Sequence, residues 1–232
     1  MRLGIMQPYF FPYLGYFQLI HAVDNLILYD NVQYRKSSWI NRNQYLLDEM
    51  KKYFTLPLKK GSTFLNINNR FISENFDRKS FAEKLKSAYS MAPYFSDISP
   101  LLDEIIYNEE QNLVKYNNNS IIKISQFLDI KTNFLLASDI DIDHKLRGQE
   151  RVLAFCKKMN IKEYINTIGG EELYDRSVFE KEDILLNFII SQNIKYKQFK
   201  EKFVPSLSIL DVLMFNSKAN CKKLLNMYYF KH

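Results

Sequence analysis

The sequence predicts an α/β protein with a Rossmann-like layered sheet, mostly parallel, and a helical insertion in the middle of the chain. Apolar runs of strand length alternate with stretches of helical periodicity from the N-terminus onward. Residues 3–29 contain a strand, a helix and a strand in succession, which is typical of a βαβ unit. No repeat, low-complexity tract or flexible linker divides the chain, so we expect a single domain over residues 1–232.

The first βαβ unit is expected from three consecutive segments. Residues 3–6 form a short apolar run of the kind found in buried strands. After a Pro-bounded turn, residues 13–23 have helical spacing that places most of their large apolar side chains on one face. Residues 25–29 (NLILY) form a second apolar run, where we expect a second buried strand.

The middle of the chain is expected to be mainly helical. Residues 53–58 have strand character. Residues 77–92 and 101–128 have helical patterns, and we expect interruptions near Pro93 and Pro100. The helical insertion is therefore placed at about 77–128, where its helices could cover the sheet as a cap.

Strands and helices alternate again towards the C-terminus. Residues 184–190 fit either a strand or a helix. Five further elements are expected: a strand at 133–137, a helix at 149–159, a strand at 163–168 ending at a Gly-Gly turn, an edge strand at 195–199, and a helix beginning within 208–215.

The composition indicates a folded protein with a positive charge. Hydrophobic residues make up 47% of the 232 residues, which is enough for a packed core without disulfides. Cys156 and Cys221 are too few for a disulfide framework. The N-terminus lacks the features of a signal peptide, and no apolar run approaches the ~20 residues that span a bilayer. We therefore expect a cytoplasmic protein without membrane insertion. The net charge of +6 permits an anionic partner, although scattered surface lysines would give the same charge.

The first candidate site segment, residues 7–16, follows the first expected strand and opens the first helix. In parallel sheets ligands usually bind beyond the carboxyl ends of the strands, and a helix N-terminus there offers free N–H groups to an anion. Gln7 could hydrogen-bond a substrate, Tyr9 could contact it, and Gly15 would allow a close backbone approach. The alternative is a rigid turn with aromatic side chains buried beneath it.

The second candidate segment, residues 30–43, follows the second expected strand and is richer in polar groups. Arg35 and Arg42 could hold phosphate oxygens in bidentate fashion, and Lys36 could add a point charge. Asp30 could accept a proton. The remaining candidates could bind a sugar or base by stacking or hydrogen bonding: Trp39, Gln33, Asn41 and Asn43. The alternative is an ordinary polar surface loop.

Because each segment follows a strand of the same βαβ unit, we expect residues 7–16 and 30–43 to converge on one cleft at the carboxyl edge of the sheet. Ser208 and Asp211, at the start of the last expected helix, could close this site from the other side. The alternative for this pair is an N-cap with an acidic capping box.

Several common catalytic signatures are missing from the sequence. There is no GxxxxGK[ST] phosphate loop, no GxGxxG fingerprint and no G-x-S-x-G elbow. His21, His144 and His232 lack metal-ligand spacing, and no metal is predicted. Cys156 lies in a helical apolar run and is expected to be buried and inert. No cofactor can be assigned from these residues.

Four segments carry a resemblance to a known family. The Gln-Pro-aromatic opening at residue 7 and the Trp-x-Asn-Arg-Asn motif at 39–43 together resemble the WbqC-like family. Later segments follow in the same order. The segments are QPYFFPYLGYFQLIHAVDNLILYDNVQYRKSSWINRNQYLL at 7–47, YFTLPLK at 53–59, MAPYF at 91–95 and FVPSLSILDVLMFN at 203–216.

The resemblance implies a role in the synthesis of O-antigen lipopolysaccharide or a related surface polysaccharide. Some members of the family have been proposed to transfer glycine or another amino acid to an amino sugar. The implied reaction passes an aminoacyl or acyl group to the amine of a nucleotide-linked amino sugar. Asp30 is the first candidate for the base, and Asp211 is the second. Asn31 stands where the family pattern has an Asp, which weakens any scheme that needs paired carboxylates there.

Other readings stay open. The donor could be an aminoacyl-tRNA, a thioester or an adenylate. A nucleotidylyltransferase-like enzyme is a second possibility, although the Tyr13–Tyr16 segment lacks the two histidines typical of that chemistry. The third is a non-catalytic protein that binds nucleotide sugars or serves as a scaffold in polysaccharide assembly.

Overall fold

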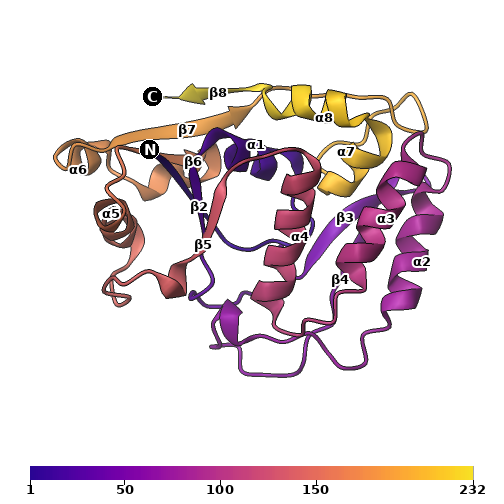
Figure 1. The fold of residues 1–232 in the computed structure, drawn as a ribbon, viewed down its shortest axis with the longest axis horizontal. Coiled ribbons are helices and arrows are strands. Elements are labelled where there is room, and N and C mark those ends of the chain that lie inside the picture. Colours follow the sequence, from indigo (N-terminus) through magenta and orange to yellow (C-terminus); the bar gives the residue numbers. More distant parts are fainter. Residues whose placement is uncertain (232) are drawn as a thin grey trace.

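The computed structural model describes residues 1–231 and has a central six-stranded sheet with the order β5-β2-β1-β6-β7-β8 (Figure 1). Every neighbouring pair is parallel except β7 and β8, which are antiparallel. The predicted α/β class with a mostly parallel sheet is therefore confirmed. The strands are β1 (Arg2–Met6), β2 (Asn25–Leu28), β5 (Asn133–Leu136), β6 (Glu163–Thr167), β7 (Leu185–Ser191) and β8 (Tyr228–Lys231).

Side chains alternate between two hydrophobic clusters along the central strands, because successive strand residues point to opposite faces. Leu26 and Leu28 of β2 belong to the larger cluster, whereas Ile27 belongs to the smaller one. The larger cluster is covered by α1 (Leu14–Ala22), the insertion and the C-terminal helices. The smaller cluster is covered by α5 (Gly148–Lys158) and α6 (Arg176–Glu180), at the left of Figure 1.

The segment between β2 and β5 contains a β-hairpin as well as the predicted helices. The hairpin, β3 (Arg42–Leu47) and β4 (Met50–Thr55), forms a separate two-stranded antiparallel sheet. A short 3-10 helix, η1 (Ile67–Asn69), follows it. Three helices then lie side by side in Figure 1: α2 (Arg78–Tyr89), α3 (Phe95–Ile106) and α4 (Leu113–Phe127).

Two details of the predicted insertion were wrong. Pro100 lies inside α3 without ending it, because Ile98 and Leu102 keep that helix anchored in the core. The predicted helix 101–128 is broken after Ile106. Asn112 then starts α4 by accepting hydrogen bonds from the N–H groups at the beginning of that helix.

The C-terminal part also departs from expectation. Residues 184–190 lie in strand β7, but residues 195–199 are not an edge strand, because Gln198 is buried and bonds Val204 and Asp211 instead. The outer edge is β8, which the sequence analysis missed. The remaining elements are η2 (Ala137–Asp139), η3 (Ile168–Leu173), α7 (Ile209–Phe215) and α8 (Lys218–Leu225).

A buried carboxyl group, that of Asp211, joins the insertion to the C-terminal helices. Its oxygens accept hydrogen bonds from the Tyr89 hydroxyl at 3.0 Å, the Tyr196 hydroxyl at 2.6 Å and the Gln198 amide at 2.7 Å. The Tyr89 hydroxyl also accepts the backbone N–H of Leu46 in β3. One tyrosine thus connects α2, the hairpin and α7.

We expect Tyr89→Phe to lower the free energy of unfolding by about 2 kcal/mol, because it leaves the buried Leu46 N–H unpaired and removes one donor from Asp211. Urea denaturation would measure this loss. Tyr107→Phe is the matched control, since Tyr107 is 46% exposed and lies at the end of α3. If the two variants were equally stable, Tyr89 would not hold the insertion in place.

Candidate functional site

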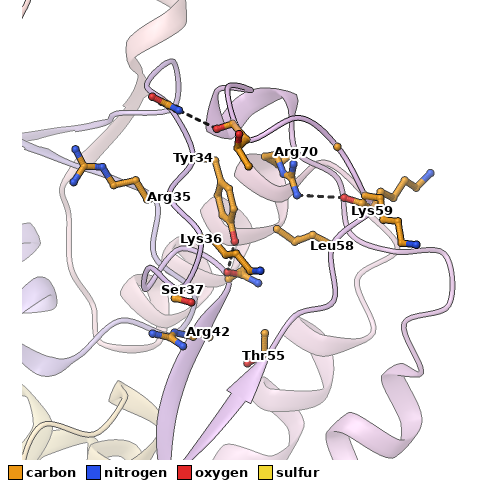
Figure 2. Close-up of a pocket in the computed structure, with 14 residues that line it drawn as sticks. Tyr34, Arg35, Lys36, Ser37, Arg42, Thr55, Leu58, Lys59 and Arg70 are labelled. Atoms are coloured by element: carbon orange, nitrogen blue, oxygen red, sulfur yellow. Dashed lines mark hydrogen bonds between the residues drawn. The ribbon is translucent and has the colours of Figure 1, made fainter.

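The main cleft of the molecule has a volume of about 710 Å³ and lies between the hairpin, the loop after β2 and the loop before η1 (Figure 2). Its lining comes from three separate stretches of the segment between β2 and the helical insertion. Six of its residues are cationic: Arg35, Lys36, Arg42, Lys59, Lys60 and Arg70. No acidic residue lines it.

Backbone pairing between distant loops gives the cleft its shape. The Tyr34 N–H donates to the Leu65 carbonyl at 3.0 Å, and Gln33 forms an isolated bridge with Asn66. The turn at residues 35–38 is closed by the Ser38 N–H to the Arg35 carbonyl at 3.2 Å. These bonds hold the basic loop after β2 against the loop that precedes η1.

Asn41 fixes the floor of the cleft. Its side-chain amide donates to the Leu56 carbonyl at 2.9 Å, and its backbone carbonyl accepts the Leu56 N–H at 2.7 Å. The Tyr34 hydroxyl donates to Asn41 Oδ1 at 2.9 Å. Burial raises the pKa of Tyr34, and the nearby cations Arg70 and Arg42 lower it in part. Tyr34 is therefore a neutral hydrogen-bonding group between two positive charges.

The positive charge of the cleft is largely uncompensated. Lys59 pairs with Glu74 at 2.5 Å, but Glu74 does not line the cleft. Within residues 1–231, none of the other five lining cations forms an ion pair. Like charges gathered in a partly enclosed space attract an anion from solution.

Five of the residues singled out from the sequence line this cleft: Gln33, Arg35, Lys36, Asn41 and Arg42. Gln33 donates to the Thr63 carbonyl at 2.9 Å, which ties the two rims together. Arg35 extends to the side of Tyr34 opposite Arg70 (Figure 2). Trp39 stands next to the cleft and stacks on Tyr53, with ring centroids 6.3 Å apart.

Three of the lining cations were missed by the sequence analysis: Lys59, Lys60 and Arg70. Arg70 follows a short 3-10 helix and has no motif around it, so only the tertiary structure reveals it. The run Lys59-Lys60-Gly61 could have been noticed as a basic loop with a glycine. Gly61 matters here, because a Cβ at that position would lie 3.0 Å from the Arg70 Nη1.

Asp30, the predicted base, is 1% exposed and does not line the cleft. Its Oδ1 accepts the Ser138 N–H at 3.0 Å, and its Oδ2 accepts the Asn68 side-chain amide at 3.2 Å. These bonds tie the end of β2 to the segment after β5 and to η1. The arrangement favours a structural role for this carboxylate.

Asn43 is also placed structurally. Its amide donates to the carbonyls of Phe10 at 3.1 Å and Phe11 at 2.8 Å. The Phe10 N–H in turn donates to the Trp39 carbonyl at 3.1 Å. Segments 7–16 and 30–43 therefore lie side by side.

The first segment nevertheless adds no residue to the lining of the basic cleft. The backbone carbonyl of Gln7 accepts a hydrogen bond from the Tyr16 hydroxyl, and the Tyr9 ring packs against the Tyr16 ring. Gly15 lines a second, smaller cavity of about 290 Å³ near Ser191 at the end of β7. The expected single cleft shared by both segments is thus replaced by two separate cavities.

Ser208 and Asp211 lie away from the basic cleft. Ser208 is the N-cap of α7, with its hydroxyl accepting the Leu210 N–H at 3.3 Å. Asp211 is fully buried, and burial raises its pKa while its three hydrogen-bond donors lower it in part. Neither side chain faces the six cations.

Neither cysteine lines the basic cleft. Burial raises the pKa of both cysteine thiols, Cys156 and Cys221, to about 12, so neither is a thiolate near neutral pH. No group of three or more His, Cys, Asp or Glu residues able to hold a metal ion occurs in the described part of the chain. Among residues 1–231, no helix has both the length and the apolar character needed to cross a membrane.

Comparison with known proteins identifies a relative that covers nearly all of the chain. An uncharacterised protein of Mycobacterium tuberculosis, Rv1507c, is 32% identical over 228 residues, covering 97% of both chains. No solved structure matches significantly. The sequence profile of the WbqC-like protein family matches residues 7–223, which include the basic cleft and four of the six strands of the central sheet. This chain belongs to the WbqC-like protein family.

Proposed function

We propose that the basic cleft binds the phosphate-bearing part of a nucleotide-linked amino sugar, and that the protein transfers an aminoacyl or acyl group to the sugar amine. One observation carries the binding part: six cations line one cleft of about 710 Å³ without an acidic residue among them. Arginine and lysine side chains in such a setting bind phosphate oxygens through charge-assisted hydrogen bonds. The transfer part rests on the family resemblance.

Transfer to an amine sets three chemical requirements. The sugar ammonium must lose a proton, the free amine must attack the acyl carbonyl, and the donor's leaving group must depart as the new amide forms. The cations could stabilise negative charge that develops on the carbonyl oxygen or the leaving group. The proton acceptor has to come from outside the lining, because the cleft holds neither a carboxylate nor a histidine.

Asp30 is the proton acceptor that we propose for this step. It lies in the loop that leads to Gln33 and Tyr34, and both of these line the cleft. With only 1% of its surface exposed, Asp30 would reach an amine only after this loop has moved.

A second candidate function is binding without catalysis. The same lack of a carboxylate or histidine in the cleft favours it. Such a protein would hold a nucleotide sugar for another enzyme of polysaccharide assembly. Native mass spectrometry of the purified protein would identify a retained small molecule. A turnover assay with that molecule and an acyl donor would then separate the two functions.

We expect the double variant Arg35→Ala/Arg42→Ala to bind a nucleotide sugar at least ~10-fold more weakly, and with a smaller dependence on salt, because two cleft cations are lost. Isothermal titration calorimetry at two salt concentrations would measure both effects. The control, Lys115→Ala/Lys223→Ala, removes the same charge from exposed positions on α4 and α8. If both variants lost affinity equally, only overall charge would matter, and the cleft would not be the binding site.

Asp30→Asn tests the proton acceptor. If Asp30 is the base, the variant should bind the nucleotide sugar nearly as wild type and turn over at least ~100-fold more slowly. It should also lose about 1–3 kcal/mol of stability, because an amide nitrogen would face the Ser138 N–H or the Asn68 amide. Asp139→Asn, in the exposed segment beside Ser138, controls for charge. Wild-type turnover in Asp30→Asn would remove Asp30 from the mechanism and leave it a structural residue.

A further inference from the structure

Two arginines of the cleft share the same kind of environment. Arg70 stacks on Tyr34, with its guanidinium carbon 4.8 Å from the ring centroid, and Arg42 stacks on Tyr53 at 4.7 Å. Both keep a buried Nε–H that has no hydrogen-bond partner within residues 1–231. Neither forms an ion pair in that part of the chain.

Arg70 is the more deeply placed of the two, with only 8% of its surface exposed. Its Nη1 donates to the Ser62 carbonyl at 3.4 Å and its Nη2 to the Lys59 carbonyl at 3.2 Å. These neutral acceptors orient the guanidinium but do not neutralise it. A buried charge without a counter-charge is costly, and it is commonly retained where a ligand supplies the missing charge.

Arg42 is held by stacking alone. Its guanidinium lies over the Tyr53 ring, and Trp39 stacks on the same tyrosine. No hydrogen bond from its guanidinium to another residue occurs in the described chain. Since Arg42 begins β3, its backbone is fixed by the hairpin while its donors stay available.

The two guanidinium groups flank a single tyrosine. The Arg70 guanidinium stacks on the Tyr34 ring, and in Figure 2 Arg42 lies below that side chain, on the side of its hydroxyl. Both arginines line the same cleft. A single small anion would satisfy one of them. An anion with two linked charged groups would satisfy both at once.

We propose that Arg42 and Arg70 form paired phosphate subsites for a diphosphate linkage, so that the ligand of this cleft is a nucleoside diphosphate sugar rather than a sugar linked through one phosphate. Bidentate guanidinium groups match phosphate oxygens, and each phosphate of a diphosphate offers such oxygens. Lys59 and Lys60, on the same rim as Arg70, add further positive charge. This inference rests on the proposed function, because it assumes a phosphorylated ligand in the cleft.

The test compares inorganic pyrophosphate with inorganic phosphate, both measured by isothermal titration calorimetry on the full chain. Wild-type protein should bind pyrophosphate at least ~10-fold more tightly than phosphate, since two subsites act together. Arg42→Lys and Arg70→Lys keep the charge but lose the planar fork. Each should weaken pyrophosphate binding about tenfold and change phosphate binding far less, because one intact subsite remains.

Arg176→Lys is the matched control. Arg176 stacks on Phe188 at 5.3 Å and donates to the Leu186 carbonyl, as a cleft arginine does, but it lies on α6 away from the cleft. The affinity of the Arg176→Lys variant for phosphate and for pyrophosphate should equal that of the wild type. Arg42→Lys keeps the test decisive even if Arg70→Lys fails to fold, because the Arg42 guanidinium holds no other residue by a hydrogen bond.

The outcomes separate the two proposals. Equal affinities of the wild type for phosphate and pyrophosphate would overturn the paired subsites while leaving a phosphate-binding cleft. Loss of affinity in Arg176→Lys as large as that in Arg42→Lys would also overturn them. If nucleotide sugars and both probes failed to bind, the proposed function itself would fall, and the paired subsites with it.

Discussion

The structure depends on how the buried loop after β1 satisfies its carbonyl groups. This loop is bounded by Pro8 and Pro12, so it can join neither a strand nor a helix, and Phe10 and Phe11 inside it are almost completely buried. Two asparagines supply the missing donors. Asn43 donates to the carbonyls of Phe10 and Phe11, and Asn117 of α4 donates to those of Pro8 at 2.8 Å and Ile40 at 2.6 Å. The same bonds dock the hairpin and α4 onto the sheet, and the cleft is shaped by the hairpin.

The parts of the fold that could be predicted from the sequence are those in which local pattern and burial agree. The first strand, helix and strand form a compact unit with regular apolar spacing, and the structure has them within two residues of the expected bounds. Strand β3 was missed because its sequence, RNQYLL, begins with polar residues whose partners come from distant loops. Residues 195–199 alternate like a strand, yet Tyr196 and Gln198 turn inward to bond a buried carboxyl group. That carboxyl group belongs to a helix further along the chain, so no local pattern could reveal it.

The candidate site likewise combines residues that the local sequence predicts with residues that only distant contacts bring in. The cations after β2 could be predicted because a polar cluster directly after a buried strand usually lies at a sheet edge. Arg70 could not, because it reaches the cleft only through the pairing of Leu58 with Ile72 and of Gln33 with Asn66. For Asp30 and Asp211, sequence position alone does not separate a catalytic role from a structural one. A carboxylate at the end of a strand or the start of a helix can serve catalysis, but it can equally accept the unpaired N–H and O–H groups that gather there. In this chain both carboxylates accept such bonds.

The position of the cleft bears on where chemistry could occur. In doubly wound sheets ligands bind where the strand order reverses, which here is between β1 and β6. The basic cleft instead lies in the segment that follows β2 and contains the hairpin. Part of the carboxyl edge of the sheet is filled by Arg151, which lies 4.8 Å from the Tyr29 ring and donates to Asn31 at 2.5 Å. Asn31 and Arg151 both lie within hydrogen-bonding distance of His144 Nδ1. The sheet edge near β2 is thus occupied by a hydrogen-bonded cluster, whereas the segment around the hairpin carries unpaired cations. The free cationic donors of this fold therefore lie beside the hairpin and not at the sheet edge. Under the function proposed above, a proton acceptor would have to reach the cleft from the loop after β2.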